Sequence, residues 1–309
     1  DELLRVVCQA GSVEVMLKIT ELSDYFTDPR YTKSRKFVPD VNPTGSANTF
    51  EYECKVKGRP SGFTLRFTDV PGEYYEEPDK RSDMEDMVRK SQVLMIAVDS
   101  PHLMESTGDK SESVNGYCCY HESYNRVAEI TDFFKTAFQN NEDIRTQNKL
   151  VIFVPLKCEK YYFRQEMERL HDMIKKGYED LFRILSSPGI NEICTVAIMP
   201  ILTIGGAEFF KFKKDSYVGE YNYVENAAFR AYLPKYCEQP LFLTLQYVIS
   251  LARRKAEGRF PLFRMFSELF GNQAKLEDLK TCEHDIKSKI MRDPALGFDI
   301  VQDPVKMIE

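Results

Sequence analysis

An acid and a glycine follow a predicted strand in the segment 63–77, FTLRFTDVPGEYYEE. Apolar and polar residues alternate from 63 to 68, which is the period of a strand with one buried face. Asp69 ends the alternation, and Gly72 comes three residues later. A carboxylate there can hold a metal ion, and a glycine lets its backbone amide approach a ligand closely. The segment therefore predicts a Mg-nucleotide site, although Asp-Val-Pro-Gly also makes a good turn after any strand.

Two later segments join apolar runs to residues with binding chemistry. The run 149–156 leads directly into Lys157 and Glu159, a base and an acid two positions apart. The run 193–202 leads into Thr203, which is followed by an isoleucine and two glycines. The two glycines have no side chain, which lets backbone amides reach a bound group. A plain surface turn is the other interpretation of the segment around Lys157.

Predicted strands and helices alternate along the chain, which predicts an α/β protein with a mostly parallel sheet covered on both faces. The near-continuous apolar run 93–99 is typical of a central strand buried on both faces. A hairpin is expected to join 50–56 to 63–69, and another hairpin or excursion is expected within 209–236. The predicted strands are 3–8, 50–56, 63–69, 93–99, 149–156 and 193–202, and helices are predicted from near 16, 74, 127, 166 and 239.

A glycine-containing turn separates the first predicted strand from a predicted helix. Met16 and Ile19 have the spacing of one helix face. Strand, glycine loop and helix in this order form the arrangement in which a phosphate-binding loop occurs. In a simpler interpretation the glycine only turns the chain. The candidate phosphate-binding residues are Gly11, Ser12, Val13, Glu14 and Val15.

These segments together resemble the motifs of P-loop GTPases over roughly residues 3–255. Asp69-Val70-Pro71-Gly72 resembles the D-x-x-G segment, and Leu156-Lys157-Cys158-Glu159 resembles N/T-K-x-D, with Leu for Asn or Thr and Glu for Asp. Within that superfamily the chain looks like bacterial translation-factor-related (TRAFAC-like) domains, which are often encoded beside components of antiphage or conflict systems. The resemblance implies a three-layer P-loop NTPase fold of the Ras-like kind.

The resemblance also implies roles for residues near the phosphates of GTP or GDP. Asp69 would hold Mg²⁺ through water, and the Gly72 amide would meet the terminal phosphate. Thr44 or Thr49, in the long polar loop, would cap the metal, although a loop threonine is also an ordinary turn residue. Glu73 would orient or activate the attacking water, which makes it the candidate catalytic residue.

Three residues have implied roles at the guanine base. The stem of Lys157 would pack along the base, and Glu159 would accept hydrogen bonds from the guanine N1 and N2. The loop that begins at Thr203 would bring backbone amides to the guanine carbonyl. The longer acid and the missing Asn both weaken this match.

The phosphate loop departs from the family pattern. A Walker A motif reads G-x-x-x-x-G-K-[ST], but Met16, Leu17 and Lys18 stand where Gly, Lys and Ser or Thr are required. Either the loop has decayed in a pseudo-GTPase, or the native protein carries a Gly-Lys-Thr tripeptide after Val15 that this chain lacks. Without that lysine we expect phosphate affinity to fall sharply. Hydrolysis of GTP is therefore predicted only if the loop is complete.

Composition narrows the classes of function further. A chain of 309 residues that is 43% hydrophobic can bury one large core. A net charge of −6 and a pI near 5.5 argue against broad nucleic-acid binding. No apolar run approaches the roughly 18 residues of a membrane span and no leader is seen, so a cytoplasmic protein is expected. The eight scattered cysteines predict reduced, packed thiols.

Two domains are expected, a GTPase-like domain over 1–257 and a C-terminal helical appendage over 258–309. Within the appendage we expect an apolar helix 260–270, a polar helix 276–291 and a final extended piece 298–301. The appendage is expected either to pack on the first domain or to dock a protein partner. The leading hypothesis is a guanine-nucleotide-binding switch with Mg²⁺ and GTP or GDP, acting in a multiprotein system such as antiphage defence. The alternative is a non-hydrolysing pseudo-GTPase that serves as an interaction scaffold. A nucleotide kinase or ATPase of the same fold is disfavoured by the acid after Lys157.

Overall fold

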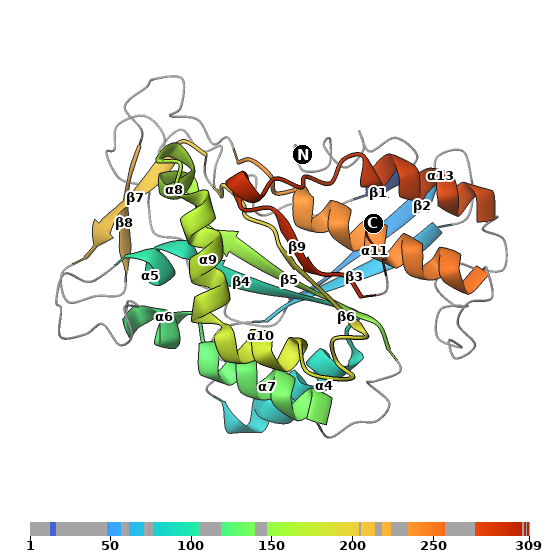
Figure 1. The fold of residues 1–309 in the computed structure, drawn as a ribbon, viewed down its shortest axis with the longest axis horizontal. Coiled ribbons are helices and arrows are strands. Elements are labelled where there is room, and N and C mark those ends of the chain that lie inside the picture. The colour runs from blue at the N-terminus through green and yellow to red at the C-terminus, as the bar shows by residue number, and fades with distance from the viewer. Residues whose placement is uncertain are drawn as a thin grey trace.

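The structure is a computed structural model. It describes residues 13–16, 48–56, 62–70, 74, 77–105, 119–139, 147–203, 205–213, 218–223, 234–256, 276–304, 306 and 308. These residues form a three-layer α/β arrangement, in which a mixed and mostly parallel sheet lies between two groups of helices (Figure 1). A smaller antiparallel sheet is formed by earlier residues.

The central sheet has four strands in the order β4-β5-β6-β9. Strands β4 (Val93–Asp99), β5 (Lys149–Leu156) and β6 (Cys194–Ile198) are parallel, whereas β9 (Asp299–Gln302) runs antiparallel beside β6. The predicted strands 93–99 and 149–156 are confirmed to the residue. The predicted strand 193–202 is shorter than expected, because β6 ends at Ile198.

Strand β5 sends alternate side chains to two hydrophobic cores, because successive side chains of a strand point to opposite faces. Val151 and Phe153 belong to one core, while Ile152 and Val154 belong to the other. The first core is completed by α4 (Arg81–Lys90), α7 (Val127–Gln139), α9 (Met167–Gly177) and α10 (Glu179–Leu185), and the second by α11 (Gln239–Ala256) and α13 (Leu276–Lys287).

Of the helices predicted from near 74, 127, 166 and 239, one is divided in the structure. The predicted helices from 127 and from 239 are confirmed as α7 and α11, and the segment after 74 is helical from Arg81. The predicted single helix 166–185 is instead two helices, α9 and α10, with Tyr178 between them. Tyr178 is fully buried, so the break is fixed by packing of a large aromatic ring that no local pattern reveals.

The prediction that 93–99 is buried on both faces is wrong. Strand β4 lies at the edge of the four-stranded sheet, and Met95 is 40% exposed. Ile96 and Val98 face the core made with α4 and α7, whereas Met95 and Ala97 point to the other face. The apolar run therefore has one buried face and one face on which Met95 and Ala97 are exposed.

Three antiparallel strands form the smaller sheet, in the order β1-β2-β3. They are β1 (Val13–Met16), β2 (Asn48–Val56) and β3 (Gly62–Asp69). The predicted hairpin of 50–56 with 63–69 is confirmed, since Phe50 pairs with Phe67. The prediction that a helix begins at Met16 is wrong, because Met16 is the last residue of β1 and pairs with Glu53.

The third sheet has two strands, which form a hairpin beyond the carboxyl ends of β4 and β5 (Figure 1). Strands β7 (Ala207–Phe212) and β8 (Gly219–Tyr223) pair antiparallel, which confirms the hairpin predicted within 209–236. The short helices near it are α5 (Ser100–Met104), α6 (Cys119–Tyr124) and α8 (Glu159–Phe163). Two 3₁₀ turns, η2 (Pro78–Lys80) and η7 (Pro294–Leu296), complete the described elements.

The last part of the chain shares the core of the α/β unit. Leu279, Cys282 and Ile286 of α13 are buried in the second core with side chains of α11. Strand β9, near the predicted extended piece 298–301, adds to the edge of β6. The expected helix from 260 to 270 lies outside the described residues.

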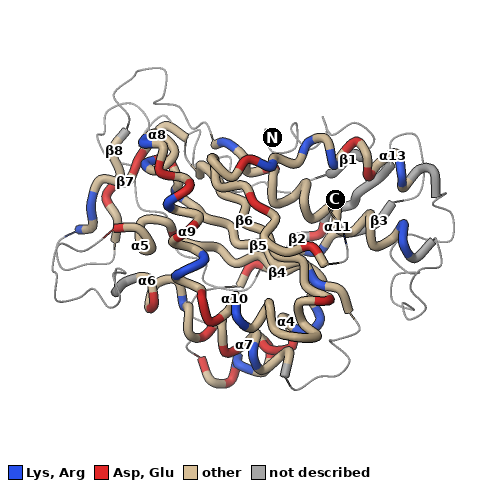
Figure 2. Tube along the Cα trace, in the orientation of Figure 1, with Lys and Arg blue, Asp and Glu red and all other residues tan. Residues whose placement is uncertain are grey.

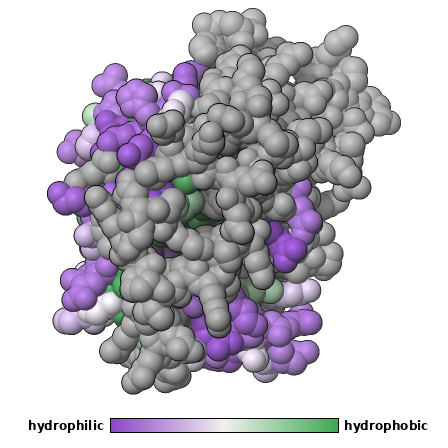
Figure 3. All heavy atoms as spheres, turned by 90° about the vertical axis from the view of Figure 1, so that its right-hand side faces the viewer, coloured by the Kyte–Doolittle hydropathy of each residue, from purple (hydrophilic) through white to green (hydrophobic). Residues whose placement is uncertain are grey.

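Charged residues of both signs are interspersed along the outer helices, while the central strands carry few (Figure 2). In the side view, hydrophilic side chains dominate the described part of the surface, and apolar ones show only in small areas (Figure 3). Among the residues that the structure describes, no helix combines the length and the apolar character needed to cross a membrane.

Candidate functional site at the carboxyl edge of the sheet

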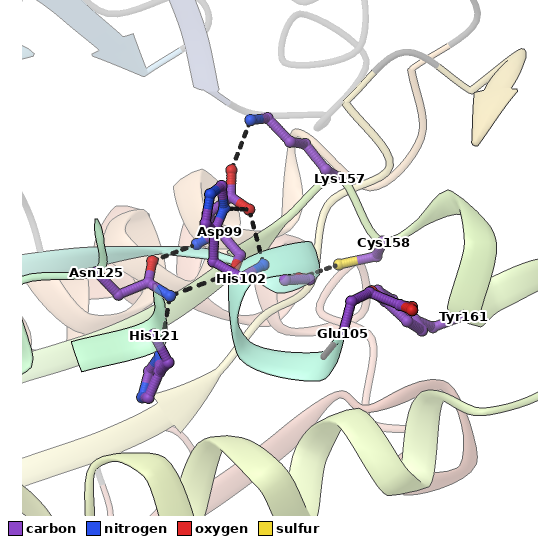
Figure 4. Close-up of polar contacts among 9 residues, drawn as sticks. Asp99, His102, Glu105, His121, Asn125, Lys157, Cys158 and Tyr161 are labelled. Carbon is purple, nitrogen blue, oxygen red and sulfur yellow. Dashed lines mark hydrogen bonds and ion pairs between the residues drawn. The ribbon is translucent and has the colours of Figure 1, made fainter. Parts of the chain in front are cut away.

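The carboxyl ends of β4 and β5 lie side by side, with Asp99 in register with Leu156. The residue after each strand is therefore held at the same edge of the sheet, and Lys157 comes next to Asp99. In open α/β sheets ligands bind outside this edge, because the loops that follow the strands converge there. The polar residues gathered at this edge form the candidate site (Figure 4).

Asp99 is the centre of the site. Its Oδ2 accepts a hydrogen bond from Lys157 Nζ at 2.5 Å, and its Oδ1 lies 2.6 Å from Nδ1 of His102. Oδ1 also accepts the backbone N–H of His102 at 3.2 Å, so Asp99 is the N-cap of α5. A short polar side chain at this position satisfies an N–H that the helix leaves open. Both oxygens of the carboxylate are thus engaged.

The charges of Asp99 and Lys157 stabilise each other. Burial alone would raise the pKa of Asp99, but the hydrogen bond with His102 and the charge of Lys157 outweigh it and hold the pKa at about 2. Burial likewise would lower the pKa of Lys157, but the Asp99 carboxylate outweighs it and raises the pKa above its ordinary value. The pair is ionised across the physiological range.

A chain of hydrogen bonds through the Asn125 amide and the His121 imidazole fixes the backbone of Asp99, and we call this chain the relay. Asn125 Oδ1 accepts the backbone N–H of Asp99 at 2.8 Å, and Asn125 Nδ2 donates to the Asp99 carbonyl at 3.2 Å. The same Nδ2 lies 2.9 Å from Nδ1 of His121, whose Nε2 lies 3.3 Å from the carbonyl of Gly177. A carbonyl only accepts, so Nε2 of His121 carries the proton and Nδ1 accepts.

His121 is neutral in this setting. Burial lowers the pKa of its imidazole to about 4, and its side chain is fully enclosed. A protonated ring would place a second donor against the Asn125 amide, which would break the relay. The relay therefore depends on an uncharged His121.

The loops after β5 and β6 are hydrogen-bonded to each other. Lys157 has a positive φ of 57°, and its backbone N–H donates to Thr203 Oγ1 at 2.9 Å. Glu159 Oε1 accepts the backbone N–H of Gly205 at 3.0 Å, and Glu159 is 2% exposed. Glu159, Lys157 and Thr203 were all predicted at the base site, and the fold brings the three together.

Cys158 and its neighbours support the loop and do not offer a reactive thiol. Cys158 Sγ donates to the Pro155 carbonyl at 3.2 Å and lies 3.4 Å from Ser100 Oγ. Burial raises the pKa of this thiol far above its ordinary value, so it is no nucleophile. Beside it, Glu105 Oε1 accepts from Lys160 Nζ at 2.5 Å and from the Tyr161 hydroxyl at 3.1 Å.

Aromatic rings enclose the outer side of the site. Tyr124 stacks on the His102 ring with centroids 3.6 Å apart, and Phe212 of β7 lies 4.8 Å from the same ring. Lys157 Nζ lies 5.6 Å from the centroid of the Tyr221 ring on β8. The hairpin thus contacts both partners of Asp99.

Two of the predicted metal residues, Thr49 and Asp69, point to opposite faces of the β2–β3 pair. Thr49 pairs with Thr68, their hydroxyls 3.4 Å apart, so both point to one face of the β2–β3 pair. Asp69 follows Thr68 and therefore points to the opposite face, exposed to solvent. Within the described parts of the chain, no group of three or more His, Cys, Asp or Glu side chains could hold a metal ion. The residues present therefore do not fit Mg²⁺ bound by Asp69 together with Thr49.

Several of the predicted site residues fall outside the described part of the chain, and three others lie in a strand. Gly11, Ser12, Thr44, Gly72 and Glu73 lie outside the described residues. The backbones of Val13, Glu14 and Val15 belong to strand β1 and pair with β2. A paired strand is not the loop that phosphate binding requires, so contact between these three residues and a nucleotide stays a prediction.

Several residues of the site were not singled out by the sequence, among them Asp99, His102, Asn125 and Tyr221. Asp99 ends a predicted strand, and an acid at the end of a parallel strand is the signal that could have identified it. Asn125 and Tyr221 carry no such signal, because they reach the site from 26 and 122 residues along the chain.

The fold and the site define an α/β protein whose polar residues gather at the carboxyl edge of its parallel strands. Comparisons with protein-family models, with curated proteins and with solved structures find no match for the chain.

Proposed function

We propose that the chain binds a guanine nucleotide at the carboxyl edge of β4, β5 and β6, with the base between the loops that follow β5 and β6. The observation that carries the proposal is the direct bonding of these loops, from Glu159 to the Gly205 amide and from Lys157 to Thr203. In P-loop GTPases, which the chain resembles, the two corresponding loops hold the base.

The donor and acceptor pattern of the loops suits a guanine. Glu159 offers carboxylate oxygens that accept from N–H groups, and the Gly205 amide offers a donor. A guanine edge carries two adjacent donors, N1 and N2, and one acceptor, its carbonyl. The base would take over the hydrogen bond that Glu159 and Gly205 make with each other. Adenine offers a single donor on that edge, so a carboxylate discriminates against it.

Asp99 and Thr203 would act as positioning residues for Lys157. Asp99 holds the ammonium at 2.5 Å, and the Thr203 hydroxyl holds the backbone N–H of the same residue at 2.9 Å. A lysine fixed at both ends presents its apolar stem in one orientation, which lowers the entropy lost when a base packs along it.

Isothermal titration calorimetry tests the proposal by comparing nucleotide binding to the wild type and to the Glu159→Gln variant. Glu159→Gln keeps an acceptor for Gly205 but turns a donor toward the guanine donors. We expect GTP and GDP to bind the variant about 10- to 100-fold more weakly, because a charge-assisted hydrogen bond contributes about 1.5–3 kcal/mol. The matched control Glu168→Gln, exposed on α9, should bind like the wild type.

Base analogues sharpen the same experiment. Inosine triphosphate lacks the N2 amino group and should bind the wild type more weakly than GTP but lose less affinity in Glu159→Gln. ATP should not compete. Equal binding of GTP and ATP, indifference to Glu159→Gln, or no binding of any nucleotide by the folded chain would each reject a guanine site.

A second candidate, the non-hydrolysing pseudo-GTPase, is favoured by one observation. Val13 to Met16 form a strand at the position where a phosphate loop is needed. The scaffold hypothesis expects no turnover of GTP. Any bound GDP and GTP should then have similar affinity, because no P-loop lysine is present to meet the terminal phosphate. Phosphate release under single-turnover conditions distinguishes the two, since a GTPase must convert bound GTP to GDP and inorganic phosphate.

A further inference from the structure

The β7–β8 hairpin packs its inward aromatic rings against two lysines, Lys157 in the loop after β5 and Lys160 in α8. Tyr221 lies 5.6 Å from Lys157 Nζ, and Phe209 lies 5.2 Å from Lys160 Nζ. Tyr221 and Phe209 are paired across the two strands, with ring centroids 5.8 Å apart. The hairpin therefore contacts the loop through two neighbouring cation–π contacts.

The inner face of the hairpin is shaped to let these rings approach. A Cβ on Gly219 would lie 3.0 Å from Cε2 of Tyr221 and 3.2 Å from Cε2 of Phe209. Such distances are closer than ordinary contact, so with a larger residue here the two rings would have to shift by a few tenths of an ångström. Phe209 is 3% exposed, whereas Phe210, on the outer face, is 54% exposed.

The ring of Tyr221 lies where the proposed ligand needs access. Lys157 is held on one side by the Asp99 carboxylate and contacted by Tyr221. Burial raises the pKa of the Tyr221 phenol well above its ordinary value, so this ring is neutral and able to pack as an aromatic surface. A base that stacks along Lys157 competes with Tyr221 for the same side chain.

We propose that the β7–β8 hairpin is a gate over the nucleotide site, and that Tyr221 holds it shut by occupying Lys157 in place of the base. The inference rests on the proposed guanine site for its ligand. The closed hairpin reduces the apparent affinity by the fraction of molecules that are open, since only the open state admits the base. Opening precedes binding and limits the association rate.

Nucleotide binding to hairpin variants tests the gate. Tyr221→Ala removes the ring and should bind a fluorescent GTP analogue on the order of tenfold more tightly, through a faster association rate. Tyr221→Phe keeps the ring but loses the hydrogen bond between its hydroxyl and Lys157, so its affinity should lie between those of the wild type and Tyr221→Ala. The control Phe210→Ala removes an exposed ring of the same strand and should change neither rate. Weaker or unchanged binding by Tyr221→Ala would overturn the gate.

Lysine labelling provides a readout that needs no nucleotide. An amine-reactive reagent, with peptide mapping by mass spectrometry, should label Lys157 and Lys160 several-fold faster in Tyr221→Ala than in the wild type. Lys149 is fully buried at the opposite end of β5 and reports on global unfolding, so its labelling should stay slow in both. Unchanged labelling of Lys157 and Lys160 in Tyr221→Ala overturns the gate.

The two readouts separate the gate from the guanine site. Faster labelling of Lys157 without binding of GTP by either protein supports a mobile hairpin and rejects the proposed ligand. Normal GTP binding with labelling and affinity that ignore Tyr221 rejects the gate and retains the ligand. Faster labelling of Lys149 together with Lys157 means that Tyr221 stabilises the fold as a whole, and this result also rejects a local gate.

Discussion

Single buried side chains set how the protein responds to pH, and His121 is the clearest case. Its imidazole is fully buried and bonded to Asn125 and Gly177. Its folded pKa of about 4 is below the ordinary value of 6.5. Between these pH values the unfolded chain binds a proton that the folded chain does not, so stability is lost as the pH falls.

We expect the free energy of unfolding to fall between pH 6.5 and pH 4 by up to about 3 kcal/mol, since one pKa unit corresponds to about 1.4 kcal/mol. Urea denaturation at a series of pH values measures this slope. His121→Gln removes the titrating group and should lose most of the slope over that range. Asp99 contributes at lower pH, because its depressed pKa makes stability fall only as the pH drops from about 3.8 toward 2.

Lys149 gives a pH dependence of the same sign at alkaline pH. Its ammonium donates to the carbonyls of Arg89 at 2.8 Å and Ser91 at 2.6 Å, at the end of α4. Burial lowers its pKa to about 8 from an ordinary 10.5. Above pH 8 the unfolded chain therefore holds more protons than the folded chain, and stability rises with pH.

We expect Lys149 to contribute a rise of about 1–2 kcal/mol to the free energy of unfolding from pH 8 to pH 9.5. The thiols of Cys158, Cys194 and Cys237 oppose this rise, because burial raises their pKa values and only the unfolded chain releases their protons in this range. Lys149→Met keeps an unbranched side chain without the charge, so its stability should fall more steeply with pH than that of the wild type. The exposed Lys287→Met is the matched control and should keep the wild-type profile. Equal profiles for all three proteins would mean that Lys149 does not titrate in this range.

At the scale of elements, the end of α9 at Gly177 packs closely against Leu103 of α5 and His121 of α6. A Cβ on Gly177 would lie 2.5 Å from Nε2 of His121 and 3.0 Å from Cδ1 of Leu103. Neither neighbour is at a free surface, since both are buried. Only a glycine therefore lets α9 end this close to the relay that supports Asp99.

Gly177→Ala should destabilise the protein by about 1–3 kcal/mol, because overpacking of a filled core costs that much. Thermal denaturation measures the loss, and Glu168→Ala on the exposed face of α9 should change little. Because the His121 ring must shift in Gly177→Ala, the acid slope attributed to His121 should change as well. An unchanged slope would separate α9 packing from the relay.

Elements that follow a strong local period were predictable, and long-range partners were not. The apolar runs of β4 and β5 and the apolar stripe of α7 are patterns of nearby residues. The predicted bounds of these three elements therefore agree closely with the structure. The edge position of β4 depends on which strands pair with it, and the break at Tyr178 depends on a buried ring.

The site was predictable to the same extent. Lys157, Glu159 and Thr203 follow strands, and proximity to a strand end is a local signal. Asp99 has the same local signal, because it ends β4, whereas Asn125 and Tyr221 are brought there by tertiary folding over tens of residues. A single sequence contains no period that links such positions.

At the scale of the whole molecule, the layer formed by α11 and α13 depends on residues far along the chain. Ile286 is fully buried, and Glu283 of α13 accepts from Ser250 at 2.6 Å and pairs with Arg253. Beneath these helices lie the side chains of β5 that face the second core, so α13 is part of the cover of the central sheet.

Ile286→Ala should lower the free energy of unfolding by about 2–4 kcal/mol, the range for truncating a large buried aliphatic side chain. Lys287→Ala, one residue further and exposed, should change it by less than about 0.5 kcal/mol. Urea denaturation should show one cooperative transition in both variants. A separate early transition in Ile286→Ala would mean that α13 unfolds independently of the sheet.

The antiparallel pairing of β9 with β6 also has a consequence for synthesis. Val196 and Gln302 are register partners, so β6 leaves the ribosome about a hundred residues before its neighbour. At a synthesis rate of about 5–20 residues per second, the outer edge of β6 stays unpaired for on the order of 10 s before β9 is made. An unpaired strand edge is a template for joining another chain. The nascent protein is therefore most exposed to aggregation after β6 has formed and before β9 arrives.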